Sequence, residues 1–192
     1  MDWRTVFGFW VLFYLSIALF YLFTGIDPFH IFIALGLLIF FLVVRRKKWY
    51  IPKSVVFFFG ISILFNSIGT FPFGGTLYGL EYYDVFAHFT GFFFLTLGVT
   101  YFYPRYAILV LALMGIGAGI EISEFLGFRL FGYGSGWLMF GEGDNSQAFG
   151  PWQDSMEDMI ANLGGIVLAI AVRWLYEKRS AGKSQAEPVS RK

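Results

Sequence analysis

Residues 106–126 read YAILVLALMGIGAGIEISEFL, and no charged residue interrupts this stretch before Glu121. A helix needs about 20 apolar residues to cross a bilayer, so the stretch predicts a membrane-spanning helix. Five further stretches share this character, and we therefore predict an all-α, polytopic membrane bundle of about six transmembrane helices. The predicted spans are Thr5–Phe23, Pro28–Val44, Val55–Phe71, Asp84–Phe102, Tyr106–Leu126 and Ser155–Tyr176.

The composition of the whole chain supports the same class. Hydrophobic residues make up 57% and aromatic residues 22%, whereas only 14% are charged. A soluble domain could not bury 26 phenylalanines with so few charges to cover them. We therefore expect membrane lipids as partners and a multi-pass location in the cell membrane. The chain has no cysteine, which excludes disulfides and thiolate metal sites.

Basic residues lie almost entirely on one side of the predicted bundle. Of the 14 lysines and arginines, only Arg129 falls on the other side. By the positive-inside rule, both termini are predicted in the cytoplasm. Residues 1–176 would form a single transmembrane helical domain, and the polar residues 177–192 a disordered cytoplasmic tail with no nucleic-acid role. The basic residues on the predicted cytoplasmic side are Arg4, Arg45, Arg46, Lys47, Lys48, Lys53, Arg105, Arg173, Lys178, Arg179, Lys183, Arg191 and Lys192.

Acidic residues gather at the opposite, extracytoplasmic ends of the last three spans. A charged side chain at the centre of a transmembrane helix costs about 2.5–3.5 kcal/mol on insertion scales, so such a cluster needs a functional or structural reason. Helical spacing of three or four residues places the members of each pair on one helix face. The polar set consists of Asp84, His88, Glu121, Glu124, Asp154, Asp158 and Asn162.

Paired carboxylates and a histidine on neighbouring helices are how helical bundles build metal sites. We predict His88, Glu121, Asp154 and Asp158 as ligands of a divalent metal ion. Oxygen ligands with one imidazole suit Mg, Mn, Fe or Zn.

Two further acids are predicted to support this chemistry. Asp84 and Glu124 are assigned acid–base or supporting roles. Glu124 lies at a helix C-terminus, where the dipole disfavours negative charge, and such a carboxyl suits proton exchange.

Structural interpretations of the same residues remain open. Asp84 and Asp154 could each cap the start of a helix, and the whole cluster could serve only to hold the helices together through polar contacts. Gly115, Gly117 and Gly119 give the fifth predicted helix a face of small residues, and Gly164 and Gly165 do the same for the sixth, which predicts close packing of these two helices. The aromatic, glycine-rich loop 127–152 is predicted to pack as a lid over the outer end.

Three strings carry a resemblance to known families: YDVFAHF at residues 83–89, EISEF at 121–125 and GPWQDSMEDMIANLGG at 150–165. Together they resemble the motif set of YjdF-type multi-pass membrane proteins. The last string also resembles VanZ-like proteins in its Asp-x-x-Ala-Asn-x-x-Gly pattern. VanZ-like members usually carry Lys after the first Asp and Gln near the second Glu, where this chain has Val85 and Ser123 or Glu124. The VanZ resemblance implies a role connected with envelope lipids.

The leading functional hypothesis is a membrane protein whose outward-facing carboxylate and histidine site acts on, or binds, an amphiphilic substrate such as a phosphate-bearing envelope lipid. One alternative is a proton- or cation-coupled transporter, which predicts a polar path continuing to the cytoplasmic side. The other alternative is a structural membrane scaffold.

Overall fold

The computed structural model describes residues 3–24, 49–70, 82–131 and 150–186, with some positions between 36 and 47. In these segments all regular structure is helical, which confirms the predicted all-α class. Most of the second predicted span, and residues 132–149 of the predicted lid, lie outside the described residues. The long helices are α1 (Trp3–Thr24), α3 (Lys53–Thr70), α4 (Tyr83–Val99), α5 (Tyr106–Phe131) and α7 (Pro151–Ala186).

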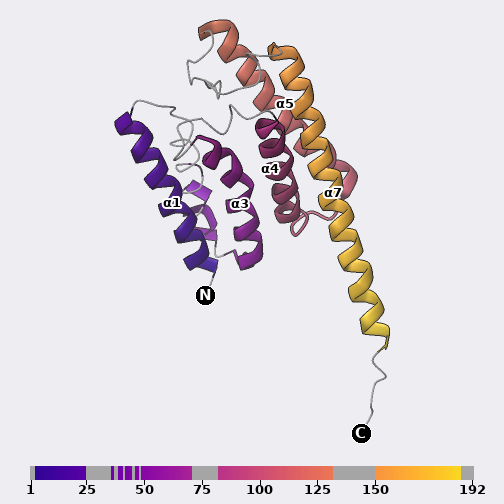
Figure 1. Cartoon of the computed structure of the whole chain (residues 1–192). Helices are drawn as coiled ribbons and strands as arrows, with labels where there is room; N and C mark the ends of the chain where they lie inside the picture. The colour runs from indigo at the N-terminus through magenta and orange to yellow at the C-terminus, as the bar shows by residue number, and fades with distance from the viewer. Residues whose placement is uncertain are drawn as a thin grey trace.

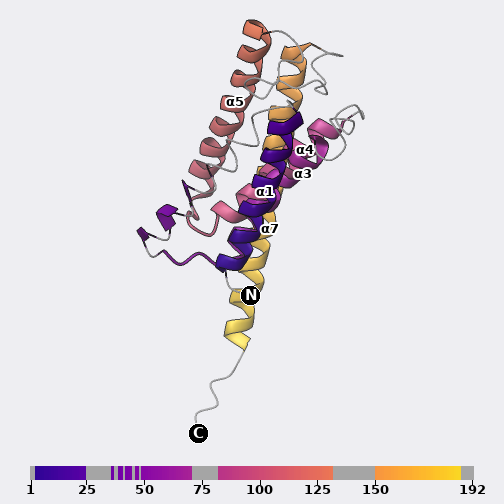
Figure 2. The same cartoon turned by 90° about the vertical axis from the view of Figure 1, so that its left-hand side faces the viewer.

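The helices α1, α3, α4 and α7 lie side by side in one layer (Figure 1). Figure 2 shows this layer nearly edge-on, with α5 to one side of it. Packing contacts join α1 to α3, α3 to α4, α4 to α7 and α7 to α5. In Figure 1, α1 begins and α7 ends at the lower end of the bundle, whereas α5 ends and α7 begins at the upper end.

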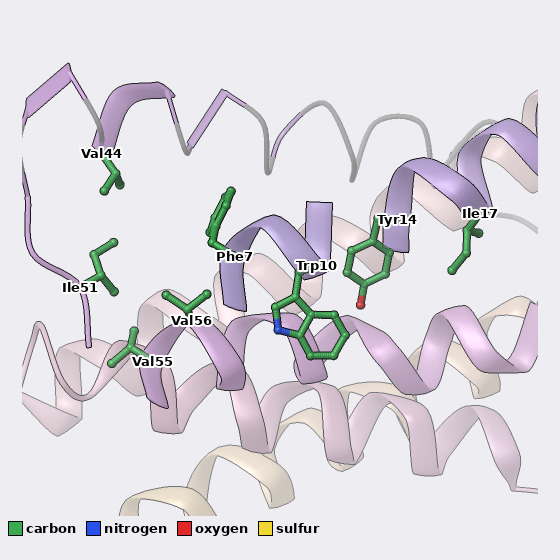
Figure 3. Packing of buried hydrophobic residues seen from close by; sticks show 8 residues of the cluster. All are labelled: Phe7, Trp10, Tyr14, Ile17, Val44, Ile51, Val55 and Val56. Carbon is green, nitrogen blue, oxygen red and sulfur yellow. The ribbon is translucent and has the colours of Figure 1, made fainter. Parts of the chain in front are cut away.

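A hydrophobic cluster joins α1 to α3 at one side of the bundle (Figure 3). Phe7, Trp10, Tyr14 and Ile17 recur at the three- and four-residue spacing of one helix face, and all are buried. Gly60 of α3 gives this face room, because a Cβ there would overlap the Trp10 indole. The Tyr14 hydroxyl donates a hydrogen bond of 2.8 Å to the Gly60 carbonyl oxygen, which fixes the register of the two helices.

Glycine also sets the packing of α7, but against α4. A Cβ on Gly165 would overlap the carbonyl oxygen of Phe89 and come within 3.0 Å of the Phe93 nitrogen. Gly115 and Gly119 of α5 instead face open space. Of the three α5 glycines in the predicted packing, Gly117 does meet α7, because a Cβ there would come 2.8 Å from Asn162 Nδ2. The tight backbone contact of α7 is with α4 instead.

Two helices are long and apolar enough to cross a membrane: the Tyr106–Gly127 part of α5 and the Trp152–Ser180 part of α7. The segments Trp3–Ile17, Lys53–Phe65 and Tyr83–Val99 are apolar but shorter. Both statements apply to the residues that the structure describes.

The C-terminal helix extends further than predicted. α7 continues to Ala186, so residues 177–186 are helical where the composition predicts a disordered tail. Pairs spaced by four residues support this extension: Arg173 Nε lies 2.7 Å from Glu177 Oε1, and Lys178 Nζ lies 4.6 Å from the Trp174 ring centroid. The remaining residues 187–192 lie outside the described part.

Candidate functional site

Side chains from α4, α5 and α7 converge on the imidazole of His88. The His88 side chain is 9% exposed and stands in the second turn of α4. Glu121 approaches it from the second half of α5, and Asp158 and Asn162 approach from α7. The imidazole is thus enclosed by ionisable and amide groups from three helices.

Two aspartates face one nitrogen of the ring. His88 Nε2 lies 3.7 Å from Asp84 Oδ1 and 3.8 Å from Asp158 Oδ2. One oxygen from each aspartate and one ring nitrogen all lie within 4.8 Å of one another. Asp84 and Asp158 are buried, with only 1% of Asp158 exposed. This spacing allows a small shift of side chains to bring all three atoms onto one cation.

The other ring nitrogen faces an amide and a glutamate. His88 Nδ1 lies 3.2 Å from Asn162 Oδ1, within hydrogen-bonding distance. It lies 3.7 Å from Glu121 Oε1, an ion-pair distance rather than a hydrogen bond. The two sides of the imidazole therefore have different partners: two aspartates at Nε2, and Asn162 with Glu121 at Nδ1.

Local helix geometry explains how these groups reach the ring. Asp158, Asn162 and Gly165 recur at spacings of four and three, so they share the face of α7 that packs on α4. Below the site, Phe92, Leu109, Leu113 and Ile166 form a buried apolar cluster that joins the same three helices.

The structure argues against the capping interpretation of the two N-terminal aspartates. α4 is capped by Tyr82, which has a left-handed backbone (φ 66°) and no side-chain capping bond, so Asp84 lies inside the first turn. α7 begins at Pro151, and the Asp154 backbone N–H donates to the Gly150 carbonyl oxygen at 3.3 Å. Both aspartates therefore lie past the N-cap position.

The structure places the predicted site residues around His88 differently from the sequence prediction. Asp84, predicted as an acid–base group, is on the Nε2 side with Asp158, whereas Glu121, predicted as a ligand, is on the Nδ1 side. Asp154 is buried one helical turn before Asp158, and it falls outside the group of three convergent ligand atoms. Glu124 is half-buried and also falls outside this group.

Asn162 has a more direct role than the sequence suggested. Its position four residues after Asp158 marks it as part of the polar face of α7, but spacing alone does not reveal its contact with His88. Gly117 of α5 lies against the same amide, because a Cβ there would come 2.8 Å from Asn162 Nδ2.

Comparisons of this chain with family models, with curated proteins and with solved structures find no match. The resemblance to YjdF-type and VanZ-like proteins therefore stays a prediction.

Proposed function

We propose that this chain is a multi-pass membrane protein whose carboxylate and histidine site binds a divalent metal ion near the outer leaflet, and through it a phosphate-bearing lipid. The observation that carries the proposal is the convergence of Asp84, His88 and Asp158 from two helices.

The exposure of apolar side chains on α5 and α7 supports the membrane part of the proposal. The core helix of a soluble protein is mostly buried, but only 22% of the apolar α5 segment and 28% of the α7 segment are buried. Leu111 of α5 is 74% exposed and Ile160 of α7 is 71% exposed. Contact with acyl chains accounts for such surfaces, whereas water does not.

Exposed aromatic residues are spaced by about the thickness of a bilayer. Trp152 and Trp174 of α7 are both exposed, and their separation in sequence corresponds to about 33 Å of helix. Tyr82 and Tyr101, which flank α4, are exposed and lie about 28 Å apart on the same scale. The hydrocarbon core is about 30 Å thick, and Trp and Tyr favour its two boundaries.

The charge distribution supports an outward-facing site. Lys53 begins α3, Arg105 precedes α5, and Arg173 lies in the second half of α7, toward the end of the bundle opposite His88. Under the positive-inside rule this basic end faces the cytoplasm and the His88 end faces outward.

The donor set is consistent with a divalent metal. Zn, Mn and Fe bind both carboxylate oxygens and imidazole nitrogen, and Mg binds the carboxylate oxygens. A bound cation would also offset the cost of burying Asp84 and Asp158 so close together. When bound, the metal would supply positive charge for the phosphate oxygens of a lipid headgroup, and the exposed α5 and α7 surfaces would face its acyl chains.

The buried threonines of α4 give little support to the alternative of a coupled transporter. Thr90, Thr96 and Thr100 are the buried polar residues of α4 and its C-cap that follow His88 toward the cytoplasmic side. Their hydroxyls donate to the carbonyl oxygens of Phe86, Phe92 and Leu97 one turn earlier, at 2.7, 2.6 and 2.9 Å. Hydroxyls that are hydrogen-bonded within their own helix are poor binding positions along an ion path.

Metal analysis of the purified protein tests the proposal with a matched pair of substitutions. Asp158→Asn and Glu157→Gln each convert a carboxylate to an amide, at adjacent positions of α7. Asp158 faces His88, whereas the Glu157 carboxylate lies at the surface and accepts a hydrogen bond of 3.0 Å from Gln153 Nε2. We expect wild type and Glu157→Gln to bind about one equivalent of Zn²⁺ or Mn²⁺, and Asp158→Asn to bind none.

The lipid part is tested by adding vesicles with and without an anionic phospholipid to these preparations. Phospholipid binding that depends on both the metal and Asp158 would support the proposal. A folded wild-type protein that binds no divalent metal would refute the metal site, and it would favour the scaffold interpretation.

A further inference from the structure

Asn162 is fully buried, and its side chain lies between His88 and α5. Its Oδ1 lies 3.2 Å from His88 Nδ1, while its Nδ2 points toward Gly117 and has no hydrogen-bond partner among the described residues. The amide is therefore engaged with the imidazole through its carbonyl oxygen.

This contact determines where the proton of a neutral imidazole resides. A neutral ring has one N–H and one lone pair, and the Asn162 carbonyl oxygen can only accept a hydrogen bond. His88 Nδ1 must then carry the proton, which leaves the Nε2 lone pair facing Asp84 and Asp158. Metal-binding histidines commonly donate their other ring N–H to an oxygen acceptor in this way.

We infer that Asn162 is a positioning residue that holds His88 in the tautomer whose Nε2 binds the metal together with Asp84 and Asp158. The inference rests on the proposed metal site and adds the residue that orients its histidine. With a cation offsetting the two aspartates at Nε2, the Glu121 carboxylate, 3.7 Å from Nδ1, also favours an N–H at Nδ1. Gly117 has a part as well, because it leaves the space that the Asn162 amide occupies.

The opposite orientation of the amide makes a different prediction. With Nδ2 toward the ring, His88 Nδ1 would accept a hydrogen bond, and Nε2 would carry the proton and donate to the aspartates. His88 would then be unable to bind a metal through Nε2, and loss of the Asn162 amide would not lower the metal affinity.

The experiment measures Zn²⁺ affinity of the full chain in lipid nanodiscs, since Zn²⁺ binds nitrogen and oxygen sites more tightly than Mn²⁺ or Fe²⁺. Asn162→Leu keeps the shape but removes the acceptor, and we expect its Zn²⁺ affinity to fall about 10- to 100-fold. Asn162→Asp keeps an acceptor oxygen and is expected to retain Zn²⁺ binding. The ¹⁵N spectrum of Zn²⁺-loaded wild type is expected to show His88 protonated at Nδ1 and metal-bound at Nε2.

A glycine pair provides a second test that leaves Asn162 itself intact. In Gly117→Ala the new methyl group meets the end of the Asn162 side chain, which can rotate away, so the protein should fold but bind Zn²⁺ less tightly. Gly115→Ala on the same helix meets nothing within 4 Å and should bind as wild type does.

The outcomes separate the inference from the proposed function. Zn²⁺ binding by wild type that is unchanged in Asn162→Leu and in Gly117→Ala would overturn the inference and leave the metal site standing. Absence of Zn²⁺ binding by folded wild type would overturn both. Loss in these two variants, with retention in Asn162→Asp and Gly115→Ala, would establish the positioning role.

Discussion

Replacement of Gly165 by alanine should separate α4 from α7 and destabilise the protein. The added Cβ would overlap the carbonyl oxygen of Phe89 and lie 3.0 Å from the nitrogen of Phe93. Both neighbours are backbone atoms of α4, so no side-chain rotation can relieve the overlap. The two helices must move apart along the contact that brings Asp158 to His88.

The magnitude follows from two opposing terms. Overpacking of a well-packed interior costs about 1–3 kcal/mol, and the rigid neighbours here place Gly165→Ala at the upper end of that range. Alanine in a helix interior regains about 1 kcal/mol of intrinsic propensity relative to glycine. The expected net loss in free energy of unfolding is therefore about 2 kcal/mol.

The same change at other glycines provides the controls for this measurement. Gly119→Ala adds its methyl group to open space, so the propensity gain is unopposed and the variant should be at least as stable as wild type. Gly164→Ala meets the Phe89 ring at 3.3 Å, a movable neighbour, and should fall between the two. Equilibrium unfolding in mixed micelles, followed by tryptophan fluorescence, measures all three. Equal stability of the Gly165 and Gly119 variants would refute the packing argument.

Two further predictions concern the α1–α3 contact and the orientation in the membrane. Tyr14→Phe removes the buried hydrogen bond to Gly60 and should lower the free energy of unfolding by about 1 kcal/mol, measured by the same unfolding assay; an unchanged value would mean that this bond does not stabilise the contact. The chain has no cysteine, so single Gln153→Cys and Lys178→Cys variants can be labelled in intact cells with a membrane-impermeant maleimide. Labelling is expected at 153 and not at 178, and the reverse pattern would contradict the proposed orientation.

The helices were predictable from the sequence because long apolar runs with few charges leave little alternative to helix. The predicted start of α5 at Tyr106 is confirmed, and α4 begins one residue before the predicted Asp84. The end of α7 was missed because composition alone predicts disorder for the polar residues beyond Tyr176. The pairing of Arg173 with Glu177 and the stacking of Lys178 on Trp174 favour continued helix there.

The site was predictable only in part. Helical spacing identifies which polar residues share a face, and it correctly indicates that His88, Glu121 and Asp158 meet. Spacing does not determine how far each helix is rotated about its axis, and this rotation decides which ring nitrogen a carboxylate faces. The positions of Asp84 near Nε2 and of Glu121 near Nδ1 follow from that rotation.

One face of α7 connects the packing of the bundle to its chemistry. Gly165 sets how closely this face approaches the α4 backbone, and Asn162 and Asp158 stand one and two turns before it on the same face. His88 receives one of these residues at each ring nitrogen, so a change in the spacing of α4 and α7 alters both contacts together. Gly165→Ala should therefore weaken metal binding at the proposed site without changing any ligand. Unchanged metal affinity in a destabilised Gly165→Ala protein would show that the ligands do not depend on this helix contact.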